Sequence, residues 1–559
     1  MFYWRVTMFW SRGRGYLWKC IAEWREYLVI ASSIAFIGST QLALGSESVR
    51  TCNVKVLSPL APVGMSIESA QLDDAENGAC VLTGRVKTRS QGLPDGSARF
   101  TLTLPRDWSH RFVFWGVGGY GGDLSPAVTE SDLHTALQRG YATGITDTGH
   151  KAPTTKLVDA SFALKKAGLP DRAAKADYYF RATHDVTVAL KEFTKAYYGM
   201  SIRYSYFDGC SNGGRQAMVE AEQYPDDYDG VIAGDPALDL RLELSDIRVH
   251  KAYLSHPDSR LWGRDLTLVD NYVLKQCDEL DGVKDGVIQD AGACHPDLAA
   301  LICRGGQTTG CLTAGQVNTL LAFTSPTLNE KGQEIYPGFP LGYYMQTRAQ
   351  QWQFGTDDLP TPPTGQPWPE DTGPYEYQFD DQTLKYIVLQ NPEADFMAYP
   401  FGDSQTANSA VLKDYDDAVQ EGDARDPRRL LPFLHRNGKL IMFHGYADTS
   451  ISPFGSIAFY RELLAAGKQD SLAPQSNVAL FMVPGMGHCA GGATPTIFDT
   501  LSALQDWTER GVFPHQIIAV SENAPEYSMP LCPYPQMAKL TGNSPHRSND
   551  WTCTIAPKR

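Results

Sequence analysis

The pentapeptide Gly209-Cys210-Ser211-Asn212-Gly213 follows a strand-like stretch, residues 203–208, and precedes a stretch with helical character, residues 214–224. This order matches the nucleophile elbow G-x-S-x-G, in which a serine lies at the tip of a strained turn between a strand and a helix. Small glycines let neighbouring backbone pass close to such a turn. Glycine-rich turns that contain serine are common, so the pentapeptide alone is a weak signal. Its strand-turn-helix context favours a catalytic serine over a purely structural turn.

A second tripeptide, Gly487-His488-Cys489, places a histidine beside a cysteine, just as Cys210 lies beside Ser211. A serine alcohol is a poor nucleophile at neutral pH and needs an imidazole within about 3 Å to accept its proton. A disulfide between the two flanking cysteines would hold serine and histidine together. The pattern therefore suggests a covalently tethered catalytic centre.

A hydrolase elbow also requires an acid and then a histidine later in the chain, each placed after a strand. The apolar run at residues 439–444 precedes Asp448, and a second run at residues 478–483 precedes His488. We expect Asp448 to orient the imidazole of His488 and to stabilise its protonated form. Two alternatives stay open: Asp448 could cap a helix that begins near Pro453, and His488 could be an ordinary loop residue.

The glycine-rich loop Gly116-Val117-Gly118-Gly119-Tyr120-Gly121-Gly122 follows an early strand-like run and fits the second half of an oxyanion hole. We expect the backbone N–H groups of Asn212 and Gly119 to face the oxyanion, with Gly118 as the next choice. A phosphate cradle is disfavoured, because the loop has neither a G-K-[ST] ending nor dinucleotide spacing into a helix. A plain flexible turn stays an alternative.

Together these residues resemble the tannase and feruloyl esterase family, which also contains the mono(2-hydroxyethyl) terephthalate hydrolases. The similarity covers nearly the whole chain after the leader, including residues 146–150 and 485–489. In that family the cysteines beside the serine and the histidine are disulfide-bonded, which implies a Cys210–Cys489 bridge here. The resemblance also implies an aromatic acyl group, such as feruloyl, caffeoyl or galloyl, held beneath a lid.

The length after the leader, about 510 residues, exceeds one ordinary domain and indicates a core with a large insertion. Regular alternation of strands and helices lapses after residues 231–234 and resumes at Lys439. We therefore predict an α/β-hydrolase fold whose catalytic domain comprises residues 46–239 and 430–559, with a lid domain at residues 240–429.

An acidic loop, residues 277–290, lies inside the predicted lid. Carboxylates and glycines in a tight wrap offer the oxygen ligands that Ca²⁺ prefers, although the spacing departs from the EF-hand pattern. The loop resembles the lid calcium loop of the family, which implies a structural calcium ion rather than a catalytic one. The implied ligands are the side chains of Asp278, Asp281 and Asp285 and the backbone carbonyls of Val283 and Val287. A solvated acidic turn is the alternative.

Eleven cysteines leave one odd thiol, and Cys20 is the natural odd one because it lies in the leader. Sequence alone does not prove how the other ten pair. Local spacing suggests four bridges in addition to Cys210–Cys489, the last three of which resemble those of the family: Cys52 with Cys80, Cys277 with Cys294, Cys303 with Cys311, and Cys532 with Cys553.

Residues 1–45 read as a signal peptide, with five basic residues before an apolar run at residues 27–44 and small residues before a cleavage site after Gly45. Export, to the exterior or the periplasm, would explain the cysteines. A retained membrane anchor is the alternative; no other stretch is long and apolar enough to span a membrane. The net charge of −15 argues against a nucleic-acid partner. The sequence does not indicate an oligomeric state.

The function predicted from these observations is that of a secreted serine esterase, which cleaves esters of hydroxycinnamic or gallic acids through an acyl-enzyme. The rival enzymes share the fold: a terephthalate half-ester hydrolase, a lipase, a peptidase or another carboxylesterase. Two non-enzymatic rivals also remain, an adhesion or binding module on a hydrolase scaffold and a calcium-dependent carbohydrate binder.

Overall fold

The computed structural model describes residues 51–127, 130–153, 158–369 and 371–555. The predicted signal peptide lies outside these residues. The described residues belong to one contact-defined unit, Val49–Arg559. Among them, no helix combines the length and the apolar character that crossing a membrane would require.

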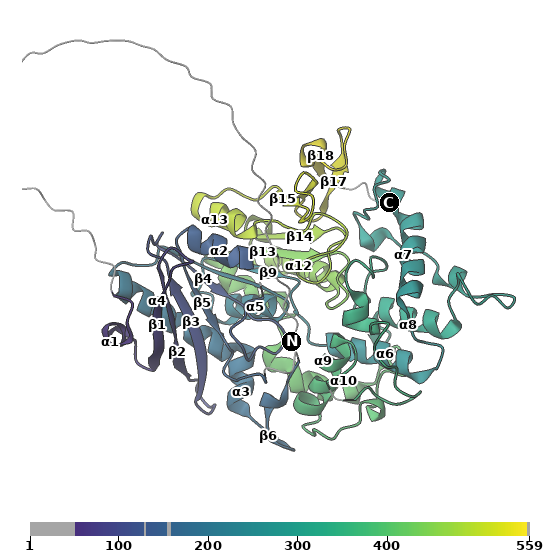
Figure 1. The fold of residues 1–559 in the computed structure, drawn as a ribbon, viewed down its shortest axis with the longest axis horizontal. Helices are drawn as coiled ribbons and strands as arrows, with labels where there is room; N and C mark the ends of the chain where they lie inside the picture. Colours follow the sequence, from purple (N-terminus) through teal and green to yellow (C-terminus); the bar gives the residue numbers. More distant parts are fainter. Residues whose placement is uncertain (1–50, 128–129, 154–157, 370, 556–559) are drawn as a thin grey trace, which may run out of the picture. The chain divides into compact units, whose positions relative to one another are not determined.

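A nine-stranded sheet organises the fold, in the order β1-β2-β3-β5-β4-β8-β9-β13-β14 (Figure 1). Strands β1, β2 and β3 pair antiparallel with their neighbours, whereas β5, β4, β8, β9, β13 and β14 run parallel to one another. The strands are β1 (Met65–Asp73), β2 (Ala79–Thr88), β3 (Gly96–Leu104), β4 (Arg111–Trp115), β5 (Tyr141–Thr146), β8 (Tyr204–Cys210), β9 (Gly230–Gly234), β13 (Lys439–Gly445) and β14 (Val478–Val483). This mostly parallel sheet confirms the predicted α/β-hydrolase fold.

Helices cover both faces of this sheet, because successive strand residues point to opposite sides. In β4, Phe112 and Phe114 join a core with helices α4, α5 and α12, whereas Val113 and Trp115 join a second core with α2 and α13. The helices are α2 (Glu130–Gln138), α4 (Ala182–Tyr198), α5 (Asn212–Gln223), α12 (Pro453–Gln469) and α13 (Thr500–Arg510). Buried on both faces, the parallel strands are almost wholly apolar runs.

Between β9 and β13 the chain contributes no strand to the nine-stranded sheet. We call residues 240–429 the insertion. Its principal helices are α6 (Leu242–Ser255), α7 (Gly263–Cys277), α8 (Ala314–Thr324), α9 (Tyr375–Gln382) and α10 (Ser409–Val419), and its small sheet consists of β10 (Thr327–Asn329), β11 (Glu334–Tyr336) and β12 (Thr406–Ala407). In Figure 1 these helices, in teal and green, lie together and away from β1–β3.

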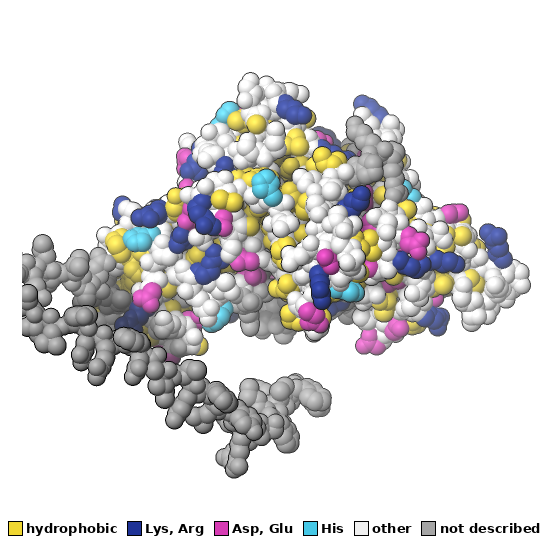
Figure 2. Space-filling view, turned by 90° about the horizontal axis from the view of Figure 1, so that it is seen from above, with side chains coloured by type: hydrophobic (Ala, Val, Ile, Leu, Met, Phe, Trp, Pro, Cys, Tyr) yellow, Lys and Arg dark blue, Asp and Glu magenta, His cyan; other side chains and the backbone are white. Residues whose placement is uncertain are grey.

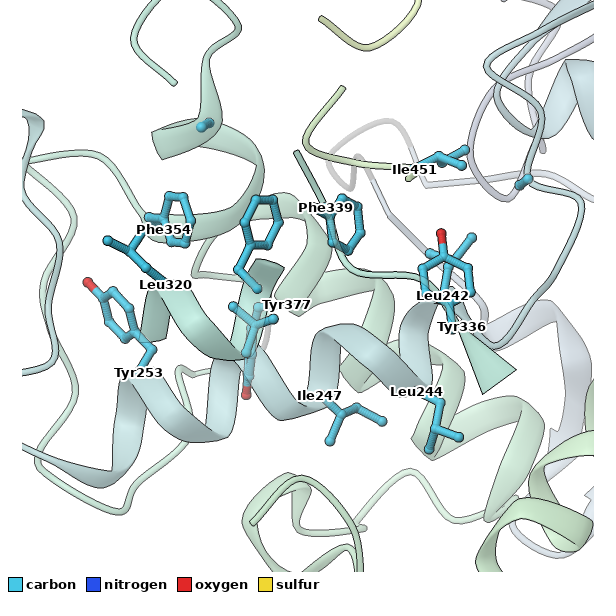
Figure 3. Packing of buried hydrophobic residues seen from close by; sticks show 14 of the residues in the cluster. Leu242, Leu244, Ile247, Tyr253, Leu320, Tyr336, Phe339, Phe354, Tyr377 and Ile451 are labelled. Carbon is cyan, nitrogen blue, oxygen red and sulfur yellow. The ribbon is translucent and has the colours of Figure 1, made fainter. Parts of the chain in front are cut away.

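The insertion has a hydrophobic core in which helices α6, α8 and α9 meet. Figure 3 shows Ile247 and Tyr253 of α6 with Leu320 of α8 and Tyr377 of α9, all buried. Most of the aromatic residues of the insertion belong to this core. Ile451, which follows β13, packs into the same cluster and so joins the insertion to the loop that carries Asp448.

Shorter elements complete the described chain. Three two-stranded sheets pair β6 with β7, β15 with β16, and β17 with β18. The remaining α-helices and β-strands are α1 (Val54–Leu57), α3 (Arg172–Ala176), α11 (Leu431–His435), β6 (Leu164–Lys166), β7 (Leu169–Pro170), β15 (Ile517–Val520), β16 (Ser528–Leu531), β17 (Gln536–Leu540) and β18 (Trp551–Ile555), and short 3-10 and π-helical turns lie between them.

Five disulfides join the ten cysteines outside the predicted leader, and every predicted pair is confirmed. The pairs are Cys52–Cys80, Cys210–Cys489, Cys277–Cys294, Cys303–Cys311 and Cys532–Cys553. The second bridge spans 279 residues of sequence and joins the end of β8 to the loop after β14.

Figure 2 shows acidic and basic side chains interspersed over the face in view.

Candidate active site

Ser211 lies in the sharp turn between β8 and α5, where the elbow pattern predicted it. Its backbone has φ 63° and ψ −125°, a strained conformation for a residue with a side chain. Close backbone contacts explain the glycines: a Cβ on Gly209 would lie 2.7 Å from the backbone of Gly213, and one on Gly213 would lie 3.1 Å from that of Gly116. The tight turn leaves Ser211 half-buried, while the residues that follow it in α5 are buried.

Asp448 and His488 lie in the loops after β13 and β14, and their side chains meet. His488 Nδ1 is 2.8 Å from Asp448 Oδ2, and the imidazole is only 6% exposed. The other carboxylate oxygen of Asp448 accepts hydrogen bonds from the N–H groups of Ser450 (2.7 Å) and Ile451 (3.1 Å). Asp448 thus fixes the turn at residues 448–451 with one oxygen and contacts His488 with the other. It does not cap α12, whose N-cap residue is Ser452, so the helix-cap alternative is wrong.

Electrostatics favour an ionised Asp448 beside a basic imidazole. Burial alone would raise the pKa of Asp448, but attraction to His488 and hydrogen bonds from His488 and His444 hold it well below the usual range. Burial alone would lower the pKa of His488, but attraction to Asp448 and its hydrogen bond raise it above the ordinary value. The pair is therefore arranged to accept a proton at Nε2 and to stabilise the resulting imidazolium.

Asp235, at the end of β9, joins the loops that carry the acid and the histidine. Its carboxylate accepts hydrogen bonds from Gly445 N–H (2.7 Å) and from Cys489 N–H (2.8 Å), and it is fully buried. Its backbone φ is +35°, which is unusual for a residue other than glycine. Burial raises the pKa of Asp235 to about 6 despite the nearby His444. One side chain therefore holds residues 445 and 489 beneath the Cys210–Cys489 bridge.

Sequence reasoning missed this role, because Asp235 looked only like the end of a strand. A usable signal was present: the residue follows β9, which pairs with β13, and the carboxyl ends of neighbouring parallel strands meet at one edge of the sheet.

The glycine-rich loop after β4 is fastened to the elbow helix. Asn212 Nδ2 donates to Val117 O (2.9 Å), and Val117 N–H donates to Gln216 Oε1 (3.0 Å). The Tyr178 hydroxyl lies 3.2 Å from both Gly119 O and Asn212 Oδ1. The structure thus brings together the two residues expected to supply oxyanion donors. Gly119 adopts φ +52°, and Asn212 is the first residue of α5, so its N–H has no partner within the helix.

The insertion contacts the loops after β13 and β14 directly. Trp352 packs edge-on against the imidazole of His488, with ring centroids 5.2 Å apart. Gln353 Nε2 donates to Thr449 O (2.9 Å), and Ser450 Oγ donates to a carboxylate oxygen of Glu376 (2.5 Å). The sequence did not predict this role for Trp352. Its place beside His488 depends on tertiary folding that no local pattern encodes.

The acidic loop in the insertion offers carboxylate oxygens as metal ligands. Val283 N–H donates to Asp281 Oδ1 (2.8 Å), and Gly286 N–H donates to Asp278 Oδ1 (2.9 Å). Asp281 Oδ2 and Asp285 Oδ2 are buried, and neither forms a hydrogen bond with the part of the chain that the structure describes. Buried carboxylate oxygens without donors are costly unless a cation or a proton neutralises them. The residues present therefore fit an oxygen-liganded cation such as Ca²⁺.

Comparison with known proteins extends these observations. A family model described as "Tannase and feruloyl esterase" matches residues 80–554. A probable feruloyl esterase B-2 from Aspergillus flavus is 31% identical over 439 residues, which cover 74% of this chain and 75% of that protein. The mono(2-hydroxyethyl) terephthalate hydrolase of Piscinibacter sakaiensis is 28% identical over 531 residues, covering 86% of this chain and 85% of the other.

Solved structures agree with these matches. The crystal structure of feruloyl esterase B from Aspergillus oryzae superposes with a TM-score of 0.72 at 26% identity and covers 88% of this chain and 97% of the other. Tannin acyl hydrolase from Aspergillus niger gives a TM-score of 0.68 at 20% identity, over 90% and 95% of the respective chains. At that identity the second likeness concerns the fold alone.

Proposed function

Since the chain belongs to the tannase and feruloyl esterase family and is a carboxylic ester hydrolase, we propose that it cleaves esters of aromatic acids through a serine acyl-enzyme. The observation that carries the proposal is the meeting of three loops. A strained serine elbow, a buried Asp448–His488 pair and a disulfide between the residues adjoining Ser211 and His488 converge at one edge of the sheet.

The proposed reaction has two steps. His488 Nε2 takes the proton of Ser211 as Oγ attacks the ester carbonyl carbon, and the N–H groups of Asn212 and Gly119 stabilise the oxyanion. The tetrahedral intermediate expels the alcohol, which receives the proton from His488. Water, deprotonated by the same imidazole, then attacks the acyl-enzyme and releases the acid. Asp448 keeps the imidazole oriented and stabilises its charged form.

Asp235 acts in this proposal as a positioning residue. Because it holds the backbone at residues 445 and 489, it limits movement of Asp448 and His488 relative to β9. The Cys210–Cys489 bridge adds a covalent limit between the loops of the nucleophile and the base. Such restraint matters because small misplacements of reacting groups are costly in rate.

The substrate class rests on the insertion and on the relatives. Trp352 lies beside His488, and the Phe379 ring is close enough to Gly119 that a Cβ there would lie 3.4 Å from it. Two aromatic rings of the insertion thus flank the proposed reaction centre, a setting suited to a flat aromatic acyl group. The relatives named feruloyl esterase, and the similarity to the solved feruloyl esterase B, support feruloyl esters, and the family description, which includes tannase, supports galloyl esters as the alternative. We therefore propose that the insertion is a lid domain over the acyl pocket.

Two further features belong to the proposal. Asp278, Asp281 and Asp285 would hold a structural Ca²⁺ together with the carbonyls of Val283 and Val287, and the ion would neutralise the buried carboxylates of the lid. The five disulfides support an oxidising destination, so we propose a secreted or periplasmic protein.

Hydrolysis rates across a panel of methyl esters test the proposal. Wild-type protein should hydrolyse methyl ferulate, caffeate, sinapate or gallate faster than methyl esters of short aliphatic acids. Ser211→Ala should abolish turnover while the melting temperature stays unchanged. Faster hydrolysis of mono(2-hydroxyethyl) terephthalate than of every hydroxycinnamate and gallate would instead favour the activity named for the Piscinibacter relative. Wild-type rates in the Ser211→Ala variant would refute the serine mechanism.

A further inference from the structure

A second cluster of ionisable side chains lies on the face of the sheet that α4 and α5 cover. Among the described residues, three groups each bring three possible metal-ligand atoms within 4.8 Å of one another, and two of these groups are part of the candidate active site. The third consists of His184 on α4, Glu220 on α5 and Asp227 in the loop before β9. Glu220 is nine residues beyond Ser211, about 13 Å along the helix axis, so this cluster is separate from the triad.

Glu220 lacks the partners that a buried carboxylate normally has. Its side chain is fully buried, and neither of its oxygens accepts a hydrogen bond from the residues that the structure describes. The neighbouring cation, Lys191, does not bond to Glu220, because its Nζ donates to Asp227 O and to Ser205 Oγ. Burial and the adjacent Asp227 carboxylate raise the pKa of Glu220 well above its ordinary value. Two carboxylates in contact need either a shared proton or a shared cation.

The histidine favours the cation. His184 Nδ1 is 2.6 Å from Asp227 Oδ2, and its ring stacks on Tyr224 with centroids 3.7 Å apart, which fixes the ring plane. One nitrogen of His184 and one oxygen from each of the two carboxylates lie within 4.8 Å of one another, so the donor set is of mixed character. Such a set suits Zn²⁺, which accepts imidazole and carboxylate ligands together.

We propose that His184, Glu220 and Asp227 form a binding site for a divalent transition-metal cation of the Zn²⁺ type, distinct from the catalytic centre. With metal–ligand bonds of about 2.0–2.2 Å, tetrahedral ligand atoms lie about 3.3 Å apart, so His184 and Asp227 need to separate by less than about 1 Å. The side chains of His184 and Asp227 are 28% and 14% exposed, which gives an ion a path from solvent. Water completes the coordination.

The site would be structural. It joins α4, the elbow helix α5 and the loop leading into β9, and it neutralises a buried carboxylate of the helix that begins directly after Ser211. A bound ion stabilises the folded chain by mass action, because the unfolded chain does not present the three ligands together.

Calorimetric titration of the full-length chain with ZnCl₂, after chelation and return to buffer with calcium, tests the proposal. Wild-type protein should bind one Zn²⁺ at this site and melt at a higher temperature in its presence. Glu220→Gln keeps the shape of the side chain but removes its charge. It should weaken zinc binding at least about tenfold, reduce the thermal shift at the same zinc concentration and leave ester turnover without zinc within about twofold of wild type.

His435→Gln is the matched control. His435 Nε2 is 2.5 Å from Asp470 Oδ2, so this residue also forms an exposed histidine–aspartate pair, but it belongs to none of the three-ligand groups of the described residues. Its loss should not change zinc affinity. Equal zinc affinity and thermal shift in wild type and Glu220→Gln would overturn the proposal. So would the absence of zinc binding by wild type, which would leave a shared proton as the explanation of the paired carboxylates.

Discussion

Removal of the Cys210–Cys489 bridge should damage catalysis more than substrate binding. In the wild type, the Cα atoms of Cys210 and Cys489 are 5.9 Å apart. The double variant Cys210→Ala/Cys489→Ala loses this covalent link between the residues adjoining Ser211 and His488. Two noncovalent restraints remain: the hydrogen bond from Cys489 N–H to Asp235 and the hydrogen bond between His488 and Asp448. The two loops should therefore stay close but become less precisely placed.

The expected magnitudes follow from these restraints. Displacement of a catalytic group by about 1 Å costs about 10²-fold in rate. Because two hydrogen bonds persist, we expect kcat to fall about 10- to 100-fold, or about 1.4–2.7 kcal/mol in activation free energy, with KM within about threefold of wild type. Stability should also fall. The chain-entropy model gives roughly 5–6 kcal/mol for a loop of this length, as an upper figure that assumes no compensating structure in the unfolded chain.

Initial rates of methyl ferulate hydrolysis and thermal melts of the same preparations separate these effects. Cys303→Ala/Cys311→Ala provides a matched control, since it removes a bridge within the insertion that spans only eight residues. It should lower the melting temperature but leave kcat within about twofold. If the Cys210/Cys489 variant melts earlier yet keeps the wild-type kcat, the tether contributes to stability alone and the catalytic argument is wrong.

The other predictions concern the pH dependence of activity and stability, and the acidic loop of the insertion. Asp448→Asn should lower kcat about 10³- to 10⁴-fold; because Asp448 raises the pKa of His488, the acidic limb of the kcat/KM profile should also move to lower pH, and an unmoved limb would contradict this assignment. Asp235→Asn retains one acceptor oxygen and should lower kcat about tenfold with KM unchanged and a smaller shift of that limb in the same direction; a change confined to the melting temperature would make Asp235 merely structural. Burial raises the pKa of Glu243 to about 7 and that of Glu222 to about 8, so the stability these groups contribute is present below their ordinary pKa and lost as pH rises through 7–8. The melting temperature should therefore be lower at pH 8.5 than at pH 5.5, and Glu243→Gln should reduce the difference. An equal difference in wild type and variant would contradict this role of Glu243. Chelation should lower the melting temperature of wild type but not of Asp281→Asn/Asp285→Asn, and equal loss in both would place the calcium elsewhere.

The strands and loops of the core were predictable because their signals are local. The apolar runs that end before Asp448 and His488 are β13 and β14, and the elbow pattern lies between β8 and α5 as its spacing requires. Parallel strands buried on both faces give continuous apolar runs, and the catalytic residues of this fold follow such runs directly. The cysteine pairs were also readable, four from their short spacing and one from the resemblance to the family.

The contributions that could not be predicted depend on tertiary contacts between distant segments. Asp235 acts on residues more than two hundred positions away, and Trp352 meets His488 only because the insertion folds back over the loops of the core. Neither has a sequence pattern that separates it from an ordinary strand end or a core aromatic. The His184–Glu220–Asp227 cluster likewise arises from the packing of α4 on α5.

The most direct measurement is the site of covalent modification by a serine-directed organophosphate. After incubation with diethyl p-nitrophenyl phosphate, the protein should lose esterase activity and gain one diethylphosphoryl group, which peptide mapping should place on Ser211. Preparations with His488→Ala should react far more slowly, because the alcohol would lack its proton acceptor. An adduct on another residue, or full inactivation with Ser211 unmodified, would contradict the proposed serine mechanism.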